Sequence, residues 1–586
     1  MRHRTAVAGS RSAILIVLAL LTPLAAVAQP PAVPEGDPAK LFQALMEDYY
    51  RAYSRKDLAG MSRACHPNGP AGTGGNVFEL EFELRDVVFK GLRLAGVAAD
   101  AGGGRARAVI DFAVTDRKTG RQRSERRVRD LTFLPEGAEW KLWNDASAAV
   151  SLAQRILAVP RNDLPALLAA EPDLLSEDAL TGLATYRVRG PSDGPPRRGN
   201  DIIEARLQVA RAAGNDLVAA KCLTDLGLQS QLGGRVPDAR RAFDEARELF
   251  ARAGTERDLA MADLNLGSVE YLDARYAQAM ERYLAALRFF ESEKDLAMVA
   301  STGHSVANCL YLLGEFEPAL EAYSRSFAVN EETGNKRGAA AVQLAMALVH
   351  KDLGDYGPAA DAYRMCADLS DAASDTNGSA KALHGLGEIR RLQGDFARAL
   401  EALHASLVRW EKTPDAPNRA GTLFSIGQVY AQQRSFTLAV DWYKQALQLD
   451  ESLGEEGGIA RDLGGLGGVH FALGEADTAL AEYERSLALR EKQGDAPGAV
   501  WTLIHMGVLH LSQSRPDEAL RVYQRAIAGA STLGDRAALA TAWALTGSAR
   551  LAGSDMEGEL EASARASDLA SQVERWDALA FARTVA

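Results

Sequence analysis

One pattern of small and apolar residues recurs every forty residues from about residue 201 onward. Each unit has a small residue in its first helix. An alanine follows twelve positions later, a bulky apolar residue four positions after that, and another small residue three further on. Apolar positions spaced three and four residues apart are typical of an amphipathic helix, so each unit predicts a helix, a turn and a second helix. One such pair cannot bury its own apolar face, and neighbouring pairs must therefore stack as a solenoid.

The columns of this pattern run without insertion through eight units. The small residues of the first helices are Gly227, Gly267, Ala307, Ala347, Gly387, Gly427, Gly467 and Gly507, and Gly547 belongs to a ninth unit. The alanines twelve positions later are Ala239, Ala279, Ala319, Ala359, Ala399, Ala439, Ala479 and Ala519. The bulky residues are Phe243, Tyr283, Tyr323, Tyr363, Leu403, Tyr443, Tyr483 and Tyr523. Small side chains let the two helices of a unit approach closely, and we expect the bulky residue to fill the space between successive pairs.

Helix ends are marked in the same register. Glycines that we expect to end second helices are Gly214, Gly254, Gly334, Gly454, Gly494 and Gly534. Side chains that we expect to cap the following helices are Asn215, Asp295, Asn335, Asp375, Asp415, Asp495 and Asp535.

Residues 38–150 change their period partway along. Leu41, Leu45 and Tyr49 have helical spacing, and apolar residues then alternate with polar ones over 78–84 and 106–114, which predicts strands. Hairpin turns are expected at 118–120 and 135–137, and the last strand is expected over 140–143. The pattern predicts helices followed by a curled antiparallel meander.

The first 28 residues have the composition of a secretory signal. Basic residues precede an apolar run over 13–21, which is too short to span a bilayer comfortably, and Ala26-Val27-Ala28 suits a signal peptidase. We expect cleavage after Ala28 and an exported chain, periplasmic or secreted; the alternative is an uncleaved anchor. Residues 29–37 are a proline-rich leader, 151–200 a helical connector and linker, and 201–214 a capping helix.

Composition and net charge argue against several classes of protein. Hydrophobic residues make up 47% of the 586, which excludes bulk disorder. The net charge of −12, from 66 basic and 78 acidic residues, argues against a nucleic-acid partner. Four cysteines exclude a disulfide-dense scaffold, and their spacing suggests free thiols, most of them buried.

The spacing of the small, alanine, aromatic and small columns resembles the tetratricopeptide repeat, in the long variant found in kinesin light chains. The resemblance covers eight units over 215–534; residues 535–586 form a degenerate ninth repeat, with Glu559 and Ser563 in its alanine and aromatic columns, and the start of a further helix. That end is either a cap or a cut in a longer chain. The order of elements over 38–150 is similar to NTF2-like (SnoaL-like) α+β cones. The expected fold class is thus mostly α: an α+β cone followed by an α-solenoid.

Catalytic and metal-binding motifs are absent from the sequence, so we expect no catalytic residue, cofactor or metal. The NTF2-like resemblance implies a pocket, for which His66 with Asp86, Asp111 or Asp116 is a candidate acid/base pair; alternatively, His66 ends a helix. The whole architecture is also similar to the non-catalytic part of bacterial proteins that end in a caspase-like CHAT peptidase. That similarity implies a sensor arm as an alternative function.

In tetratricopeptide repeats the first helices line the concave face, which implies a protein or extended peptide as partner. The residues expected there are Tyr271, His304, Asn308, Tyr311, Lys381, His384, Glu388, Arg391, Phe424, Gln428 and Phe471. Aromatic rings interleaved with polar groups suit an extended peptide, and the alternative is a merely solvated groove. The family's carboxylate clamp is only partly matched, because His304 stands beside Asn308 where a lysine is expected.

Overall fold

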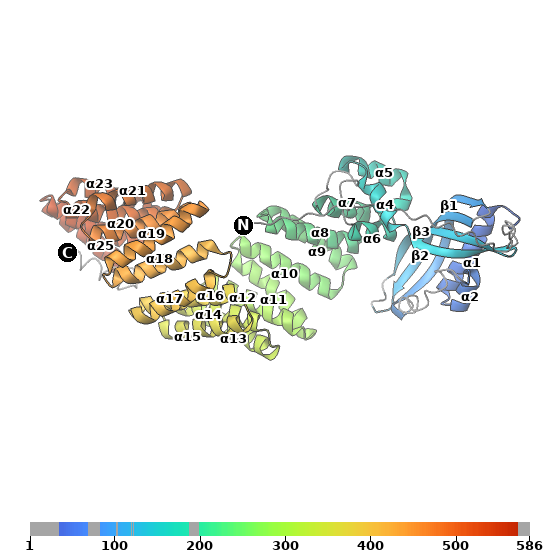
Figure 1. The fold of residues 1–586 in the computed structure, drawn as a ribbon, viewed down its shortest axis with the longest axis horizontal. Helices are drawn as coiled ribbons and strands as arrows, with labels where there is room; N and C mark the ends of the chain where they lie inside the picture. The colour runs from blue at the N-terminus through green and yellow to red at the C-terminus, as the bar shows by residue number, and fades with distance from the viewer. Residues whose placement is uncertain are drawn as a thin grey trace, which may run out of the picture. The chain divides into compact units, whose positions relative to one another are not determined.

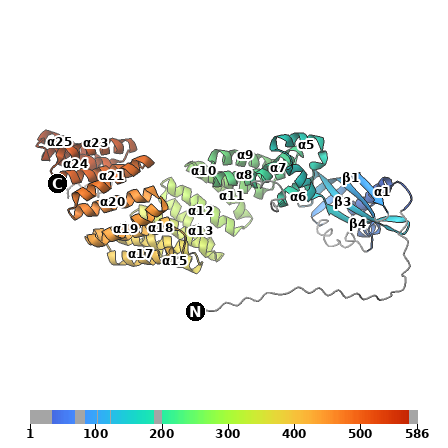
Figure 2. The ribbon, with the colours of Figure 1, turned by 45° about the horizontal axis from the view of Figure 1, so that its top comes forward.

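The computed structural model describes residues 34–67, 83–100, 103–118, 120, 122–186 and 199–571. Contacts between backbones divide the chain into two compact units, 1–262 and 263–586, which are taken separately below (Figures 1 and 2). The predicted signal segment and the rest of 1–33 lie outside the described residues, as does 572–586.

The first unit begins with two helices and a four-stranded antiparallel sheet. The helices are α1 (Pro38–Ser54) and α2 (Leu58–Ala64), and the strands are β1 (Arg85–Asp100), β2 (Gly103–Asp116), β3 (Gln122–Glu136) and β4 (Glu139–Ser147). Neighbours in the sheet follow chain order, β1-β2-β3-β4, so the predicted meander is confirmed for the described strands. The last strand also forms, and the turn that precedes it lies at 137–138, at the end of the expected 135–137. The turn expected over 118–120 includes Thr119, which lies outside the described residues. The relationship to NTF2-like cones stays a prediction.

Aromatic side chains fill the space between α1 and the sheet. Phe42 stacks on Phe133 at 3.9 Å between ring centroids and meets Trp140 edge-on at 5.2 Å. The alternating side chains of β2, from Ala106 to Val114, are at most 5% exposed, as the period of two predicts. The strand expected over 78–84 is wrong at its last residue: Leu84 is helical and 58% exposed, and pairing begins at Arg85. Residues 78–82 lie outside the described part.

Short helices then connect the sheet to the first repeat. They are α4 (Ala149–Leu157), η2 (Arg161–Asp163), α5 (Leu164–Ala170), η3 (Pro172–Leu174), α6 (Glu177–Thr185) and α7 (Gly199–Ala212). Helices α8 (Asp216–Leu232) and α9 (Val236–Ala253) are the first helix pair of the repeats. Asp178 of α6 accepts a hydrogen bond of 2.7 Å from the backbone N–H of Val128 in β3. This bond, and one apolar core shared by β3 and α4 to α9, join sheet and helices.

The remaining helices follow as pairs. They are α10 (Glu256–Leu272) and α11 (Tyr276–Ser292), α12 (Leu296–Leu312) and α13 (Phe316–Glu332), α14 (Lys336–Asp352) and α15 (Tyr356–Ala372), α16 (Thr376–Leu392) and α17 (Phe396–Trp410), α18 (Ala416–Gln432) and α19 (Phe436–Leu453), α20 (Glu456–Ala472) and α21 (Ala476–Gln493), α22 (Ala496–Ser512) and α23 (Pro516–Leu533), and α24 (Arg536–Ala552) and α25 (Met556–Ser571). The degenerate ninth unit thus forms a full pair. All seven predicted N-caps accept a hydrogen bond from the first turn of their helix. Of the six predicted terminal glycines, Gly254 alone ends its helix without a positive φ.

The repeat columns make the tight contacts that their residue types predict. All eight column alanines are fully buried. A Cβ built on Gly427 would lie 2.6 Å from the Tyr443 ring of the same pair, closer than real Cβ contacts allow. The aromatic residue also packs on the next pair, because a Cβ on Gly385 would lie 2.3 Å from Tyr363. The bulky column therefore fills the space both within and between helix pairs.

The first helices of successive pairs lie on the inner side of the stack in the second unit. Contacts run from α12 to α14 and onward through α16, α18, α20, α22 and α24. Successive second helices of these described pairs contact each other less. Elements on the inside of a curved stack lie closer together, so the inner face, meaning the surface of the first helices, is the concave face that the sequence predicts.

A leucine in the alanine column should damage the solenoid locally. Ala439 is fully buried, with 0% of its surface exposed. A leucine at this position forces α18 and α19 apart. Overpacking of this kind costs about 1–3 kcal/mol. Because repeat stability is largely a nearest-neighbour property, hydrogen exchange of Ala439→Leu should lose protection in α17 to α20. Loss confined to residues 38–150 would contradict the repeat register.

Candidate functional site

All eleven predicted groove residues lie on first helices: on α10, α12, α16, α18 and α20. The side chain of Lys381 is exposed and the other ten are half-buried. The structure therefore brings them to one face, but it also gives several of them partners within the protein.

The residues of α12 are held by their neighbours. The Tyr323 hydroxyl donates a hydrogen bond to Asn308, and the His304 ring packs against Tyr323 at 5.4 Å. Burial lowers the pKa of His304, so this ring is uncharged at neutral pH. It cannot act as the cation of a carboxylate clamp. The Tyr311 hydroxyl donates to Asp352 at 2.6 Å, and burial together with that carboxylate raises the pKa of Tyr311 to about 12.

The residues of α16 form an internal ion pair. Arg391 donates to one oxygen of Glu388 from Nε and Nη2, at 3.2 and 2.8 Å. His384 Nδ1 lies 3.1 Å from the Thr422 hydroxyl of α18, and burial lowers the pKa of His384. The three residues share a helix face, as their spacing predicts, but the arginine charge is already neutralised.

An arginine that the sequence analysis passed over lies at the centre of the inner face. The guanidinium of Arg461 in α20 stacks over the ring of Phe424, 4.8 Å from its centroid. Its Nε and Nη2 donate to Asp462 at 3.1 and 3.0 Å, and Nη2 also donates to Asp450 at 2.9 Å. The register that places Lys381 six residues before its small column places Arg461 there too, so the signal was present in the sequence.

The two aspartates are buried and compete for one cation. Asp462 is fully buried and Asp450 is 2% exposed. Burial raises the pKa of Asp462 to about 7, with Asp450 adding to the rise and Arg461 opposing it; burial raises the pKa of Asp450 as well. Equivalent positions to Asp462 hold threonine in three other repeats, at Thr302, Thr422 and Thr502. The pair of carboxyls is thus particular to this repeat.

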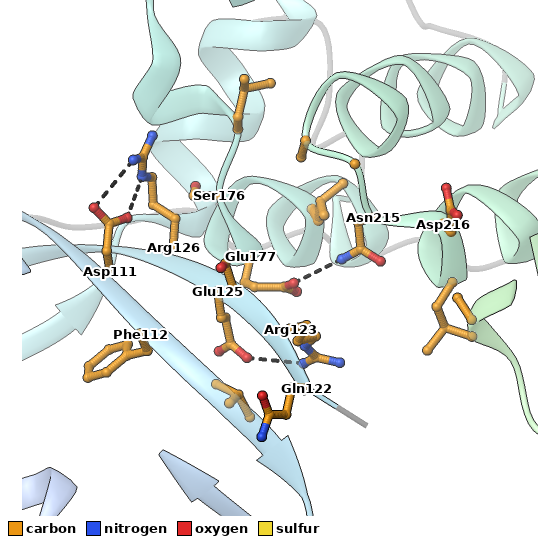
Figure 3. Close-up of a pocket in the computed structure, with 18 of the residues that line it drawn as sticks. Asp111, Phe112, Gln122, Arg123, Glu125, Arg126, Ser176, Glu177, Asn215 and Asp216 are labelled. Atoms are coloured by element: carbon orange, nitrogen blue, oxygen red, sulfur yellow. Dashed lines mark hydrogen bonds and ion pairs between the residues drawn. The ribbon is translucent and has the colours of Figure 1, made fainter. Parts of the chain in front are cut away.

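A separate cavity of about 840 Å³ lies in the first unit, between β1 to β3 and the ends of α6 to α9 (Figure 3). Its charged side chains are largely paired with one another. Arg126 donates to Asp111 at 2.7 and 3.3 Å, and Arg123 donates to Glu125 at 3.0 Å. Figure 3 shows these pairs on the sheet side, with Glu177 accepting from Asn215 at 2.9 Å on the helical side. Cations and carboxylates cancel, so the cavity has no strong preference for either sign of charge.

The acid/base pair proposed for His66 is not assembled. The backbone N–H of His66 donates a hydrogen bond to the Leu142 carbonyl of β4, and the His66 ring packs edge-on against Trp143 at 5.2 Å. Asp86 and Asp116 lie at the paired ends of β1 and β2, and Asp111 lies on β2. The sheet order places β1 and β4 at opposite edges, which sequence alone does not reveal. The described cysteines are all free and buried, and burial raises the pKa of each thiol to about 11.

Comparison with known proteins identifies the class of repeat. Residues 378–452 and 459–532 match the family model of the tetratricopeptide repeat, so the helix pairs from α16 to α23 are tetratricopeptide repeats. No curated protein matches the chain.

Several solved structures are similar to this chain at low identity. The apo quorum sensor NprR of B. thuringiensis is 14% identical, with 60% of this chain and 98% of that chain covered and a TM-score of 0.44. A STAND signal-transduction ATPase with a tetratricopeptide repeat sensor from Pyrococcus horikoshii is 11% identical, with 75% and 73% covered and a TM-score of 0.43. Aspartyl phosphate phosphatase F of Bacillus subtilis is 12% identical, with 58% and 88% covered and a TM-score of 0.41. Likeness at this level says nothing about activity.

The carboxyl pair should make the stability of α20 depend on pH. The pKa of Asp462 rises from its ordinary 3.8 to about 7 in the fold, so the folded state binds the proton more tightly than the unfolded state. Stability is therefore highest near pH 4 and falls as the pH rises to about 7, by up to about 1.4 kcal/mol per pH unit. Asp462→Thr, which copies the other repeats, should flatten this dependence. Hydrogen exchange of α19 to α21 at about pH 5 and pH 8, corrected for intrinsic rates, measures it; an unchanged slope in the variant contradicts the assignment.

Proposed function

We propose that this protein is a non-enzymatic binding scaffold whose inner face holds an extended segment of a partner protein. The observation that carries the proposal is the set of half-buried aromatic side chains on first helices, among them Tyr311 on α12, Phe424 on α18 and Phe471 on α20. A ring that is half-buried in its own fold is already ordered and still offers apolar area. Such residues are the usual anchors of protein interfaces.

The charges of the inner face indicate that affinity for a partner comes from shape and hydrogen bonding more than from ion pairs. Arg391 and Arg461 are neutralised by internal carboxylates, and Lys381 is the exposed cation among the predicted groove residues. A partner would therefore gain mainly by burying apolar side chains and by bonding its main chain to polar groups such as Gln428. An extended peptide provides both.

We also propose that the chain acts outside the cytoplasm. The basic, apolar and small segments over 1–28 support this proposal. Within the described residues, no helix has the length and apolar character needed to cross a bilayer.

The exported form should begin at Gln29, because small residues at Ala26 and Ala28 occupy the positions that a signal peptidase reads. Amino-terminal sequencing of protein recovered from the envelope and medium of an expressing bacterium tests this. An exported preparation that starts at Met1 would show that the segment is not cleaved.

Truncating the inner aromatic residues should weaken peptide binding. Linear peptides selected from a phage-displayed random library on the wild-type chain serve as probes. The double variant Tyr311→Ala/Phe471→Ala should bind them at least about 30-fold more weakly, since each anchor contributes about 2 kcal/mol. Arg391 is left in place, because its removal would leave Glu388 half-buried and unpaired.

A matched control removes exposed apolar side chains from second helices. Met365 and Val408 are 45% and 52% exposed on α15 and α17. Met365→Ala/Val408→Ala should bind the same peptides as tightly as wild type. Equal binding by the inner-face variant, or loss only in the control, would show that the inner face is not the site.

A further inference from the structure

Arg461 presents one half of its guanidinium without a partner in the protein. Its Nε and Nη2 donate to Asp462 and Asp450, whereas Nη1 makes no hydrogen bond within the described residues. The side chain remains 35% exposed. Two buried carboxylates and the ring of Phe424 hold it in place, so the free N–H groups of Nη1 are positioned before any ligand arrives.

The helix surface beside Arg461 carries no side chains at two inner-face positions. Gly464 and Gly468 lie one turn apart on α20, three residues before and one residue after the small column. Other repeats fill the first of these positions with Leu264, His304, Leu344, His384, Phe424, Ile504 and Ala544. They fill the second with Ser268, Asn308, Leu348, Glu388, Gln428, Val508 and Ser548. The inner face of α20 is therefore bare at these two positions, between Arg461 and Phe471.

Packing does not require these two glycines. A Cβ on Gly464 would meet its nearest atom, Ser486 Oγ, at 3.6 Å, and a Cβ on Gly468 would meet the Tyr483 hydroxyl at 3.5 Å. Both are ordinary contacts. By contrast, a Cβ on Gly467 would lie 2.8 Å from the Tyr483 ring. Glycine destabilises a helix interior relative to alanine, so these two residues weaken α20 without any return in packing.

Aromatic side chains lie on α20 itself and on the first helices that contact it. Phe424 comes from α18, Phe471 from the last turn of α20, and Trp501, which is 38% exposed, from α22. Helices α18 and α22 both contact α20. Gly421 of α18 adds room beside the free nitrogen, because a Cβ there would stay 3.9 Å from Nη1.

The charges at this place exclude some partners. Asp450 and Asp462 together match or exceed the single positive charge of Arg461, so another carboxylate would be repelled. The two carboxylates are buried and offer a basic side chain no contact. An uncharged acceptor, such as a main-chain carbonyl, suits the free N–H groups.

We propose that Arg461, Gly464 and Gly468 form the subsite of the inner face where the partner's main chain comes closest. An uncharged, extended stretch of the partner places a bulky apolar side chain on the bare surface of α20, between the flanking aromatic rings. One of its main-chain carbonyls accepts a hydrogen bond from Arg461 Nη1. This inference rests on the proposed function and names the segment of the partner that the inner face selects.

Filling the subsite tests the inference directly. The selected linear peptides are titrated against Gly464→Leu/Gly468→Leu, in which leucine side chains cover the bare surface. The variant should fold, because leucine favours helix more than glycine and a Cβ fits at both positions. We expect peptide binding at least tenfold weaker than wild type. The matched control is Ala544→Leu/Ser548→Leu, the same two positions of α24, which should bind as wild type does.

A second variant tests the hydrogen bond expected from Arg461 Nη1. Arg461→Lys keeps a positive charge against Asp450 and Asp462 but lacks Nη1, and it should also weaken binding at least tenfold. Hydrogen exchange of Arg461→Lys in α20 shows whether the fold is retained. If the fold is lost, peptide binding by Gly464→Leu/Gly468→Leu still tests the inference.

The possible outcomes separate the subsite from the proposed function. Peptides that lose affinity in Tyr311→Ala/Phe471→Ala but keep it in Gly464→Leu/Gly468→Leu would overturn the subsite and leave the inner face as the site. Selected peptides dominated by acidic residues would overturn the inference that the partner's segment is uncharged. If no peptide is lost in any inner-face variant, the proposed function itself fails.

Discussion

The close approach of the two helices in each repeat is the constraint on which the rest of the solenoid depends. Gly427 on α18 and Ala439 on α19 leave no room for a larger side chain, and the ring of Tyr443 lies against the glycine. Since the same three residue types recur at the same spacing, every pair has nearly the same geometry. Equal pairs stack with an equal step, and this step turns the first helices of the second unit toward a common inner face.

Buried polar groups fit into this stack by the same repeat. The hydroxyls of Ser326, Ser406 and Ser486 on second helices donate to backbone carbonyls 26 residues earlier, at 2.7, 2.7 and 2.6 Å. Each hydroxyl is thereby satisfied in a place without water, and it links a second helix to the first helix of its own pair. Other repeats place alanine or cysteine there, so the column accepts either a small apolar group or a satisfied small polar one.

The side chains that distinguish the inner face lie where the sequence departs from the repeat pattern. Charged residues on α16 and α20 are paired with carboxylates of the protein itself, which leaves aromatic rings and a few hydrogen-bonding groups as the surface open to a partner. On α20 the departure is largest, because Arg461, Asp462 and two glycines replace the residues that other repeats carry. A site grafted on a repeated scaffold is expected at such departures, since the scaffold itself is fixed by the conserved spacing of its columns.

The sequence by itself determined the helix pairs, their length and their caps, because the relevant interactions are local or repeat at a constant spacing. Gly227 and Asn335, for example, have the roles that their register predicts. It also placed the groove residues on one face, since helical spacing decides which side chains share a side. Tertiary structure alone decided which of them are free. Tyr311 of α12 is bonded to Asp352 of α14, and the acid/base partners expected for His66 lie on other strands, because pairing across helices and strands depends on distances that spacing along the chain does not contain.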